Sequence, residues 1–224
     1  MSSAAHYETI RARNLDRLRS GAVEVDATLA AGKPDCRRGV SLIIPAGGIA
    51  SAYAALADVF AAVERDQYYY PAADLHVTVF DFIQGTAAYR PDADKERAFR
   101  DIAAEAARSA APFDLTLRGV VGSAGALLIA GYDGDALVRL RERIRILMAE
   151  RGLPNDERYE SRSAHVTFLR FARQLAEPAR FVETMDRHRE TPLGTVRVER
   201  MELVEHDWYN AAATKRLIAT VGLS

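Results

Sequence analysis

The tripeptide His-Val-Thr occurs twice in this chain, at residues 76–78 and at residues 165–167, although the chain has only five histidines. Each copy lies in an apolar run with high β-propensity, and a phenylalanine, Phe82 or Phe171, follows each histidine by six residues. Alternate side chains of a strand point to the same side, so each copy presents an imidazole and a hydroxyl roughly 7 Å apart along the backbone. Two such strands facing each other would place two imidazoles and two hydroxyl groups around one cavity.

Two imidazoles and two hydroxyls around a cavity suit the opening of a cyclic phosphodiester. In-line attack on phosphorus needs one group to take a proton from water and another to give a proton to the departing oxygen. Imidazole, with an ordinary pKa near ~6.5, can do both at neutral pH. A threonine hydroxyl can stabilise charge on a non-bridging oxygen without a metal. The sequence does not say which histidine is the acid and which is the base.

The composition excludes several classes of protein. The 224 residues are 49% hydrophobic and 27% charged, as in an ordinary globular protein with a sizeable core. A net charge of −1 argues against a protein that holds long nucleic acid by bulk charge. The single cysteine, Cys36, excludes an intrachain disulfide. No apolar run approaches the ~20 residues of a membrane span, and the N-terminus has no signal-peptide pattern, so we expect a cytoplasmic protein with no membrane partner.

The hydrophobic periodicity predicts alternating groups of helices and strands. Helices are predicted at 5–19, 50–65, 92–109 and 178–189, and strands at 40–44, 74–83, 113–121, 125–132, 163–171, 194–206 and 215–223. Residues 135–151 fit both a strand and a helix, but their length and the following Gly152 favour a helix with its arginines on a solvated face. The order gives two similar arrays with a hinge near 133–155, and predicts an α+β fold of mostly antiparallel sheets with helices on the outer faces.

Paired apolar-His-apolar-Thr-apolar motifs at this spacing resemble the two-histidine (2H) phosphoesterase superfamily, which includes cyclic phosphodiesterases and proteins named 2′-5′ RNA ligases. The resemblance covers residues 39–224 and implies one bilobal, pseudo-twofold domain whose motif strands line a central cleft. Residues 1–38 are then an N-terminal helical extension. The resemblance implies that His76 and His165 are the catalytic pair, which should face one another within about 10 Å. It implies that Thr78 and Thr167 bind phosphate.

The resemblance also implies a substrate-binding arginine after the second motif, at the position of Arg170. Strand alternation, however, turns Arg170 to the opposite face from His165 and Thr167. The implied activity is opening of a 2′,3′-cyclic phosphate or a related nucleotide or RNA-end phosphodiester, with no metal and no cofactor. The alternatives are a 2′-5′ RNA ligase and a non-catalytic module that binds nucleotides or RNA ends. The oligomeric state stays open.

The remaining polar and aromatic residues have plainer interpretations. His206 stands between two acidic residues, but no second cluster has metal-ligand spacing, so we interpret it as a surface residue and predict no metal site. The tyrosines at 68–70 are interpreted as packing at the entry of a strand, with base stacking as the alternative. Trp208 and Tyr209 follow a predicted strand and are candidates for lining the cleft.

Overall fold

The computed structural model describes residues 2–155, 157 and 161–224. The strands are β1 (Arg38–Pro45), β2 (Tyr68–Tyr69), β3 (His76–Thr86), β4 (Phe113–Gly122), β5 (Ala126–Tyr132), β6 (Val166–Arg170), β7 (Pro192–Val198), β8 (Arg200–Asp207) and β9 (Arg216–Gly222). The α-helices are α1 (Ser3–Ser20), α2 (Ala27–Ala30), α3 (Ala50–Ala61), α4 (Ala93–Arg108), α5 (Ala136–Glu150) and α6 (Pro178–Arg187). None of these helices is long and apolar enough to cross a bilayer.

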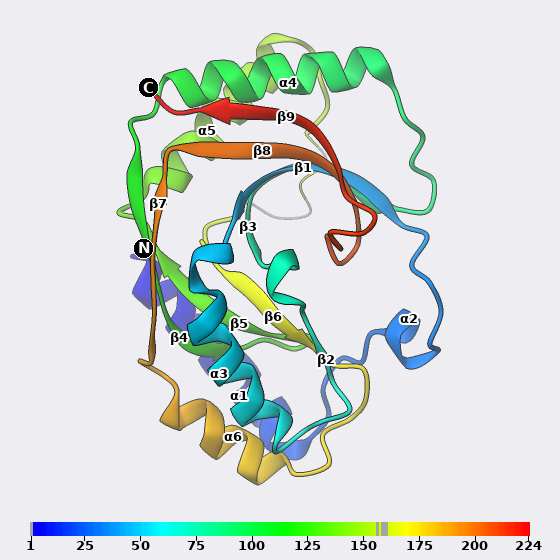
Figure 1. The fold of residues 1–224 in the computed structure, drawn as a ribbon, viewed down its shortest axis with the longest axis vertical. Helices are drawn as coiled ribbons and strands as arrows, with labels where there is room; N and C mark the ends of the chain where they lie inside the picture. The colour runs from blue at the N-terminus through cyan, green and yellow to red at the C-terminus, as the bar shows by residue number, and fades with distance from the viewer. Residues whose placement is uncertain (1, 156, 158–160) are drawn as a thin grey trace.

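The strands of this part of the chain form one curled sheet in the order β7-β4-β5-β6-β3-β1-β8-β9, with β2 paired to β6 (Figure 1). Each strand pairing is antiparallel. Helices α4 and α5 pack beside the half that contains β3, and α1, α3 and α6 pack beside the half that contains β4 (Figure 1). The α+β class and the antiparallel sheet predicted from the sequence are therefore confirmed.

The two halves of the sheet contain corresponding elements in the same chain order. Strand β1, helix α3, strand β3 and helix α4 follow one another as β5, α5, β6 and α6 do, and β3 lies beside β6 at the centre. The matched phenylalanines have matched partners, because Phe82 stacks on Phe99 of α4 at 4.7 Å and Phe171 contacts Phe181 of α6 at 5.9 Å between ring centroids. The halves are interleaved in sequence, since β8 and β9 return to the first half.

Two sequence-based assignments can be compared directly with the structure. Residues 136–150 are helical, so the preferred interpretation of 135–151 is confirmed, and this helix occupies most of the segment expected to hold the hinge. The prediction of a single strand at 194–206 is wrong, because this segment contains parts of two strands: β7, which pairs with β4, and β8, which pairs with β1. Two consecutive exposed residues, Glu199 and Arg200, interrupt the alternation there, and the chain crosses from one half to the other.

The N-terminal helix α1 packs against β4 and β5 and reaches the second motif. The Tyr7 side chain is only 2% exposed, and its hydroxyl accepts hydrogen bonds from Gly131 N (3.1 Å) and Ala164 N (3.0 Å) and donates to Gly131 O (3.2 Å). A Cβ atom on Gly131 would lie 1.7 Å from Ala164 O, so the close approach of these backbones requires glycine. Helix α1 thereby fixes the residue that precedes His165.

Candidate active site

The two motifs meet at the centre of the sheet. Their middle residues, Val77 of β3 and Val166 of β6, are directly paired. Continued by one residue in each direction, this antiparallel register sets His76 opposite Thr167 and Thr78 opposite His165. The valines are buried in the core, so the four polar side chains share the other face of the sheet. Diagonal neighbours in such a pair lie roughly 7–8 Å apart, which would bring both imidazoles within reach of one phosphate.

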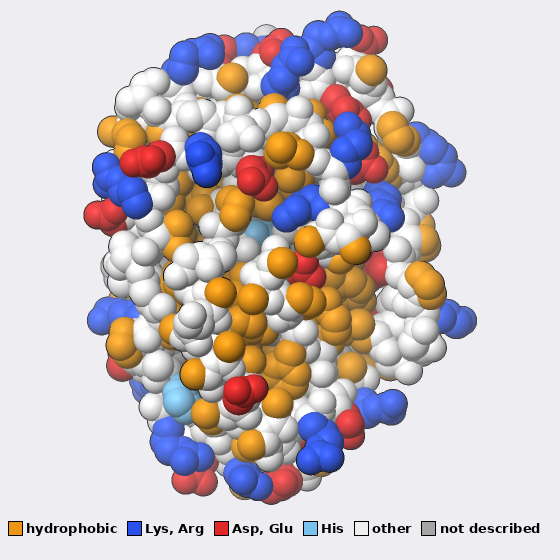
Figure 2. Space-filling model, viewed as in Figure 1, with side chains coloured by type: hydrophobic (Ala, Val, Ile, Leu, Met, Phe, Trp, Pro, Cys, Tyr) orange, Lys and Arg blue, Asp and Glu red, His pale blue; other side chains and the backbone are white. Residues whose placement is uncertain are grey.

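The side chains of all five predicted site residues line one cavity of about 340 Å³. This volume lies in the range of small-molecule binding sites. The residues that share the cavity with them include Tyr70, Asp81, Gln84, His206, Trp208 and Asn210. On the face shown in Figure 2, charged side chains of both signs lie mostly toward the margin, and hydrophobic side chains gather nearer the middle.

Arg170 lines the cavity because β6 contains a bulge. Leu169 pairs with Leu127 and Thr167 pairs with Leu128, so Phe168 is an extra residue between them. An extra residue shifts the alternation of the side chains beyond it. Arg170 is therefore on the same side as Thr167, and the expectation that strand alternation turns it away is wrong.

Strand β3 contains a bulge at the corresponding place. Phe80 pairs with Leu42 and Thr78 pairs with Ile43, so Val79 is the extra residue. This bulge brings Asp81 to the cavity, just as the bulge in β6 brings Arg170. The two strands thus present matched sets of a histidine, the threonine two positions later and a charged residue five positions later: His76, Thr78 and Asp81 from β3, and His165, Thr167 and Arg170 from β6.

The imidazole of His76 is oriented by the backbone. Its Nδ1 lies 2.7 Å from the carbonyl oxygen of Asp74, which can only accept, so Nδ1 carries the proton. Asn210 Nδ2 lies 3.0 Å from the same nitrogen and, as a donor, cannot bond to a protonated Nδ1. With its amide turned over, the buried Asn210 presents Oδ1, which otherwise has no partner among the described residues, as a second acceptor for that N–H. In neutral His76, Nε2 is therefore the unprotonated nitrogen.

The imidazole of His165 has a hydroxyl partner instead, since its Nδ1 lies 2.7 Å from Ser163 Oγ. A hydroxyl both donates and accepts, so this contact satisfies either tautomer of His165. Burial lowers the pKa of His76 and of His165 to about 4, and for His165 the positive charge of Arg141 adds to the effect. Without a ligand, both imidazoles are neutral at neutral pH.

A buried arginine joins the two motif strands. Arg141 of α5 is 1% exposed and donates to the carbonyl oxygens of Thr78 (2.9 Å), Val79 (2.8 Å) and Ser163 (2.8 Å). It therefore holds the bulge of β3 against the segment that leads into His165. The interpretation of the α5 arginines as a solvated face is wrong for Arg141. It follows Leu137 by one turn and precedes Ile144 by three residues, a spacing that marks the buried stripe of the helix.

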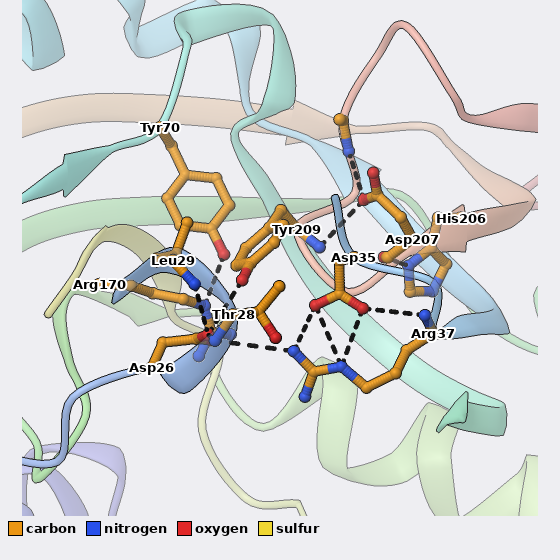
Figure 3. Close-up of polar contacts among 11 residues, drawn as sticks. Asp26, Thr28, Leu29, Asp35, Arg37, Tyr70, Arg170, His206, Asp207 and Tyr209 are labelled. Atoms are coloured by element: carbon orange, nitrogen blue, oxygen red, sulfur yellow. Dashed lines mark hydrogen bonds and ion pairs between the residues drawn. The ribbon is translucent and has the colours of Figure 1, made fainter. Parts of the chain in front are cut away.

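Aromatic residues and the N-terminal segment build the wall behind Arg170. Arg170 Nε donates to the hydroxyl of Tyr70 at 2.8 Å (Figure 3). The Arg170 guanidinium lies 5.4 Å from the centre of the Trp208 ring. The guanidinium of Arg37, which belongs to the predicted N-terminal extension (residues 1–38), lies 4.0 Å from the centre of the same ring. Tyr209 donates to Asp26 of that segment at 3.1 Å (Figure 3). Trp208 lines the cavity, so the N-terminal segment supports one wall of the site.

The interpretation of His206 as a surface residue is wrong. It lines the cavity, and its Nε2 lies 2.7 Å from Ser41 Oγ. The sequence around it gives no signal of this position, because burial there depends on the pairing of β8 between β1 and β9. Among the residues that the structure describes, no three His, Cys, Asp or Glu side chains are arranged to hold a metal ion.

Comparisons with known proteins agree on one family and one fold. A sequence profile of the 2′-5′ RNA ligase superfamily matches residues 48–210. A search of curated protein sequences gave no significant match. Among solved structures, the fold is similar to TT0787 of Thermus thermophilus (TM-score 0.57, 19% identity, 84% of this chain and 97% of that chain). It is also similar to E. coli LigT with 3′-AMP (TM-score 0.56, 17% identity, 84% and 99%). At these identities the likeness shows a shared fold.

Proposed function

Because this chain belongs to the 2′-5′ RNA ligase superfamily, we propose that it is a phosphodiesterase that opens a 2′,3′-cyclic phosphate or a related nucleotide or RNA-end phosphodiester. The observation that carries the proposal is the single cavity lined by both motif histidines, both motif threonines and Arg170. E. coli LigT has been solved with 3′-AMP, with ATP and with NADP+. These complexes support a nucleotide as the ligand of the cavity.

The phosphate is held by donors of both motif strands. The hydroxyls of Thr78 and Thr167 donate to non-bridging oxygens, and the guanidinium of Arg170 adds a positive charge whose position is fixed by Tyr70. These groups stabilise the extra negative charge of the transition state. The phosphorus atom lies near the local twofold axis between Val77 and Val166, so the two imidazoles approach it from opposite sides.

The histidines carry the two proton transfers. One takes a proton from the attacking water, and the other protonates the oxygen that leaves phosphorus, each transfer being worth about 10²–10⁴-fold in rate. His76 suits the role of base, because its contact with Asp74 O leaves Nε2 as the acceptor. His165 then serves as the acid. The negative charge of the bound phosphate raises the pKa of the imidazoles and makes the protonated acid accessible.

Turnover of a substrate panel tests the proposal. The panel contains nucleoside 2′,3′-cyclic phosphates, RNA with a 2′,3′-cyclic phosphate end and 2′-5′ dinucleotides, with wild-type protein and His165→Ala. His188→Ala removes a histidine outside the cavity and serves as the matched control. Folded wild-type protein that binds these compounds without converting any of them would be a binding module instead. Joining of RNA ends under the same conditions would make it a ligase.

The mechanism also predicts the effect of chelation. All proton transfers and charge stabilisation are assigned to side chains, so we expect turnover to be unchanged in EDTA. The measurement is the initial rate with and without chelator. Loss of activity that a divalent ion restores would replace this mechanism with metal-assisted hydrolysis.

A further inference from the structure

A second polar cluster lies along the cavity, away from the paired histidines. It consists of Ser41 of β1, Asp81 of β3 and His206 of β8. Ser41 is paired with Asp81, and His206 is paired with Gly39, two positions from Ser41, so the three side chains share one face of the sheet. Asp81 and His206 line the cavity, and Ser41 beneath them is 1% exposed. The proposed reaction uses none of these groups.

The hydrogen bonds of the cluster restrict where its protons can lie. Ser41 Oγ lies 2.5 Å from Asp81 Oδ1 and 2.7 Å from His206 Nε2. His206 Nδ1 lies 2.6 Å from the carbonyl oxygen of Asp207 and must donate to it. The single Ser41 proton can go to Asp81 or to His206, and the other neighbour must then donate to Oγ.

Two arrangements without a net charge on the cluster satisfy every contact. In the first, Ser41 donates to an ionised Asp81 and a protonated His206 donates to Ser41. In the second, Ser41 donates to a neutral His206 and a protonated Asp81 donates through Oδ1 to Ser41. Both contain the same number of protons, and moving one proton along each hydrogen bond interconverts them. In both, Asp81 Oδ2 carries no proton and can only accept a hydrogen bond. A further proton on Asp81 Oδ2, beside a protonated His206, would leave a net positive charge in this buried cluster and is therefore disfavoured.

Asp81 Oδ2 is thus an acceptor that needs a donor from a ligand. Within the part of the chain that the structure describes, it has no hydrogen-bond partner, although Asp81 lines the cavity. Asp81 follows Thr78 by three residues, but the bulge at Val79 sets the two residues opposite Ser41 and Ile43, which are two positions or roughly 7 Å apart along β1. A nucleotide whose phosphate contacts Thr78 can therefore direct the edge of its base toward Asp81.

Building on the proposed function, we propose that the Ser41–Asp81–His206 cluster is a base-specificity subsite that accepts a hydrogen bond from the amino group of a nucleobase. Cytosine and adenine offer such a group. Uracil and hypoxanthine have a carbonyl oxygen at the same position, which would face Asp81 Oδ2 without a proton between them. A buried acceptor left opposite another acceptor loses its hydrogen bond and its hydration.

The test compares substrates that differ only in this group. We expect kcat/KM for cytidine 2′,3′-cyclic phosphate to exceed that for uridine 2′,3′-cyclic phosphate by about 10- to 100-fold, as for loss of a hydrogen bond to a charged or strongly polar group. The adenosine and inosine pair should differ in the same direction. These wild-type measurements require no variant, and equal values within each pair would overturn the proposal.

Asp81→Leu then assigns the preference to this side chain. It removes the acceptor at similar shape, and the cytidine-to-uridine ratio should fall to within about threefold of unity. Asp114→Leu changes an exposed aspartate of β4 outside the cavity and should keep the wild-type ratio. Thermal unfolding checks that both variants are folded. A folded Asp81→Leu protein with the wild-type ratio would contradict the assignment.

Binding separates failure of the subsite from failure of the proposed function. Calorimetry with cytidine 3′-phosphate and uridine 3′-phosphate needs no turnover. Tighter binding of the cytidine compound, without hydrolysis of any cyclic phosphate, would support the subsite and contradict the proposed function. Hydrolysis of both cyclic phosphates at equal kcat/KM, with equal affinity for both 3′-phosphates, would support the proposed function and contradict the subsite.

Discussion

Removal of one oxygen atom, by Tyr7→Phe, tests how far the N-terminal helix contributes to the site. The Tyr7 hydroxyl is the acceptor for two backbone N–H groups, of Gly131 and Ala164, and the donor to Gly131 O. Burial raises the pKa of Tyr7 to about 12, so the hydroxyl keeps its proton at neutral pH. The variant leaves three buried backbone groups without this partner beside His165.

The expected loss of stability follows from these three groups. Each unsatisfied buried group costs about 1–3 kcal/mol, and a water molecule in the vacated space can restore part of the bonding, so we expect a total of about 2–4 kcal/mol. For a chain of this length, such a loss lowers Tm by roughly 5–15 °C. Because Ala164 precedes His165, we also expect kcat to fall at temperatures where the variant is folded.

Denaturant unfolding and steady-state kinetics measure both effects. Tyr132→Phe is the matched control, because the Tyr132 ring lies 5.7 Å from that of Tyr7, and its hydroxyl has no hydrogen bond within the described part of the chain. The control should change stability by less than about 0.5 kcal/mol. If Tyr7→Phe is no less stable than Tyr132→Phe, the hydroxyl does not hold the two backbones together and our reasoning about α1 is refuted.

The histidine pair gives two further predictions. His76→Ala and His165→Ala should each lower turnover by about 10²–10⁴-fold, and the two losses should not add fully in the double variant. Thr78→Val or Thr167→Val should lower turnover by less, because both proton carriers remain. Steady-state kinetics of the folded variants measures these effects. The second concerns pH. Because burial lowers the pKa of both histidines to about 4, the unfolded chain binds more protons than the folded chain between pH ~4 and ~6.5, so stability should fall as pH falls through that window. His165→Asn should flatten this dependence in denaturant unfolding; an unchanged slope would contradict the burial of a neutral imidazole.

Sequence patterns predicted features that depend on local periodicity. The buried stripe of α5 is an example, because Leu137, Leu140 and Ile144 recur at helical spacing whatever the helix packs against. The same stripe contains Arg141. Because arginine is usually exposed, this residue was predicted to face solvent, although its spacing places it on the buried face of the helix. The position of His206 could not be predicted, because it depends on which strand β8 joins. Strand neighbours are set by contacts far apart in sequence, and periodicity carries no information on them.

The bulges lie between these two cases. One extra residue in a strand reverses every side chain beyond it, yet it changes the apolar pattern by only one position. In both motif strands the mark is a pair of adjacent buried residues after the threonine, Val79-Phe80 and Phe168-Leu169. A pair of adjacent apolar residues is common in buried strands, so the pattern alone did not indicate a bulge. The sequence therefore predicted the strand that contains the bulge, but it did not predict that Arg170 faces the cavity.

In the proposed mechanism, the matched bulges also explain how a cleft with two similar halves can serve an asymmetric reaction. A cleft with identical halves would hold a phosphodiester equally well in two opposite orientations, but only one orientation gives water to the base and the departing oxygen to the acid. The backbone repeats closely, and the residue five positions after each histidine does not: it is Asp81 in one half and Arg170 in the other. A cation favours the anionic end of a substrate, and an acceptor favours the end that carries hydrogen-bond donors. We therefore propose that the opposite character of these two side chains selects one orientation of the substrate, and with it the proton-transfer role of each histidine.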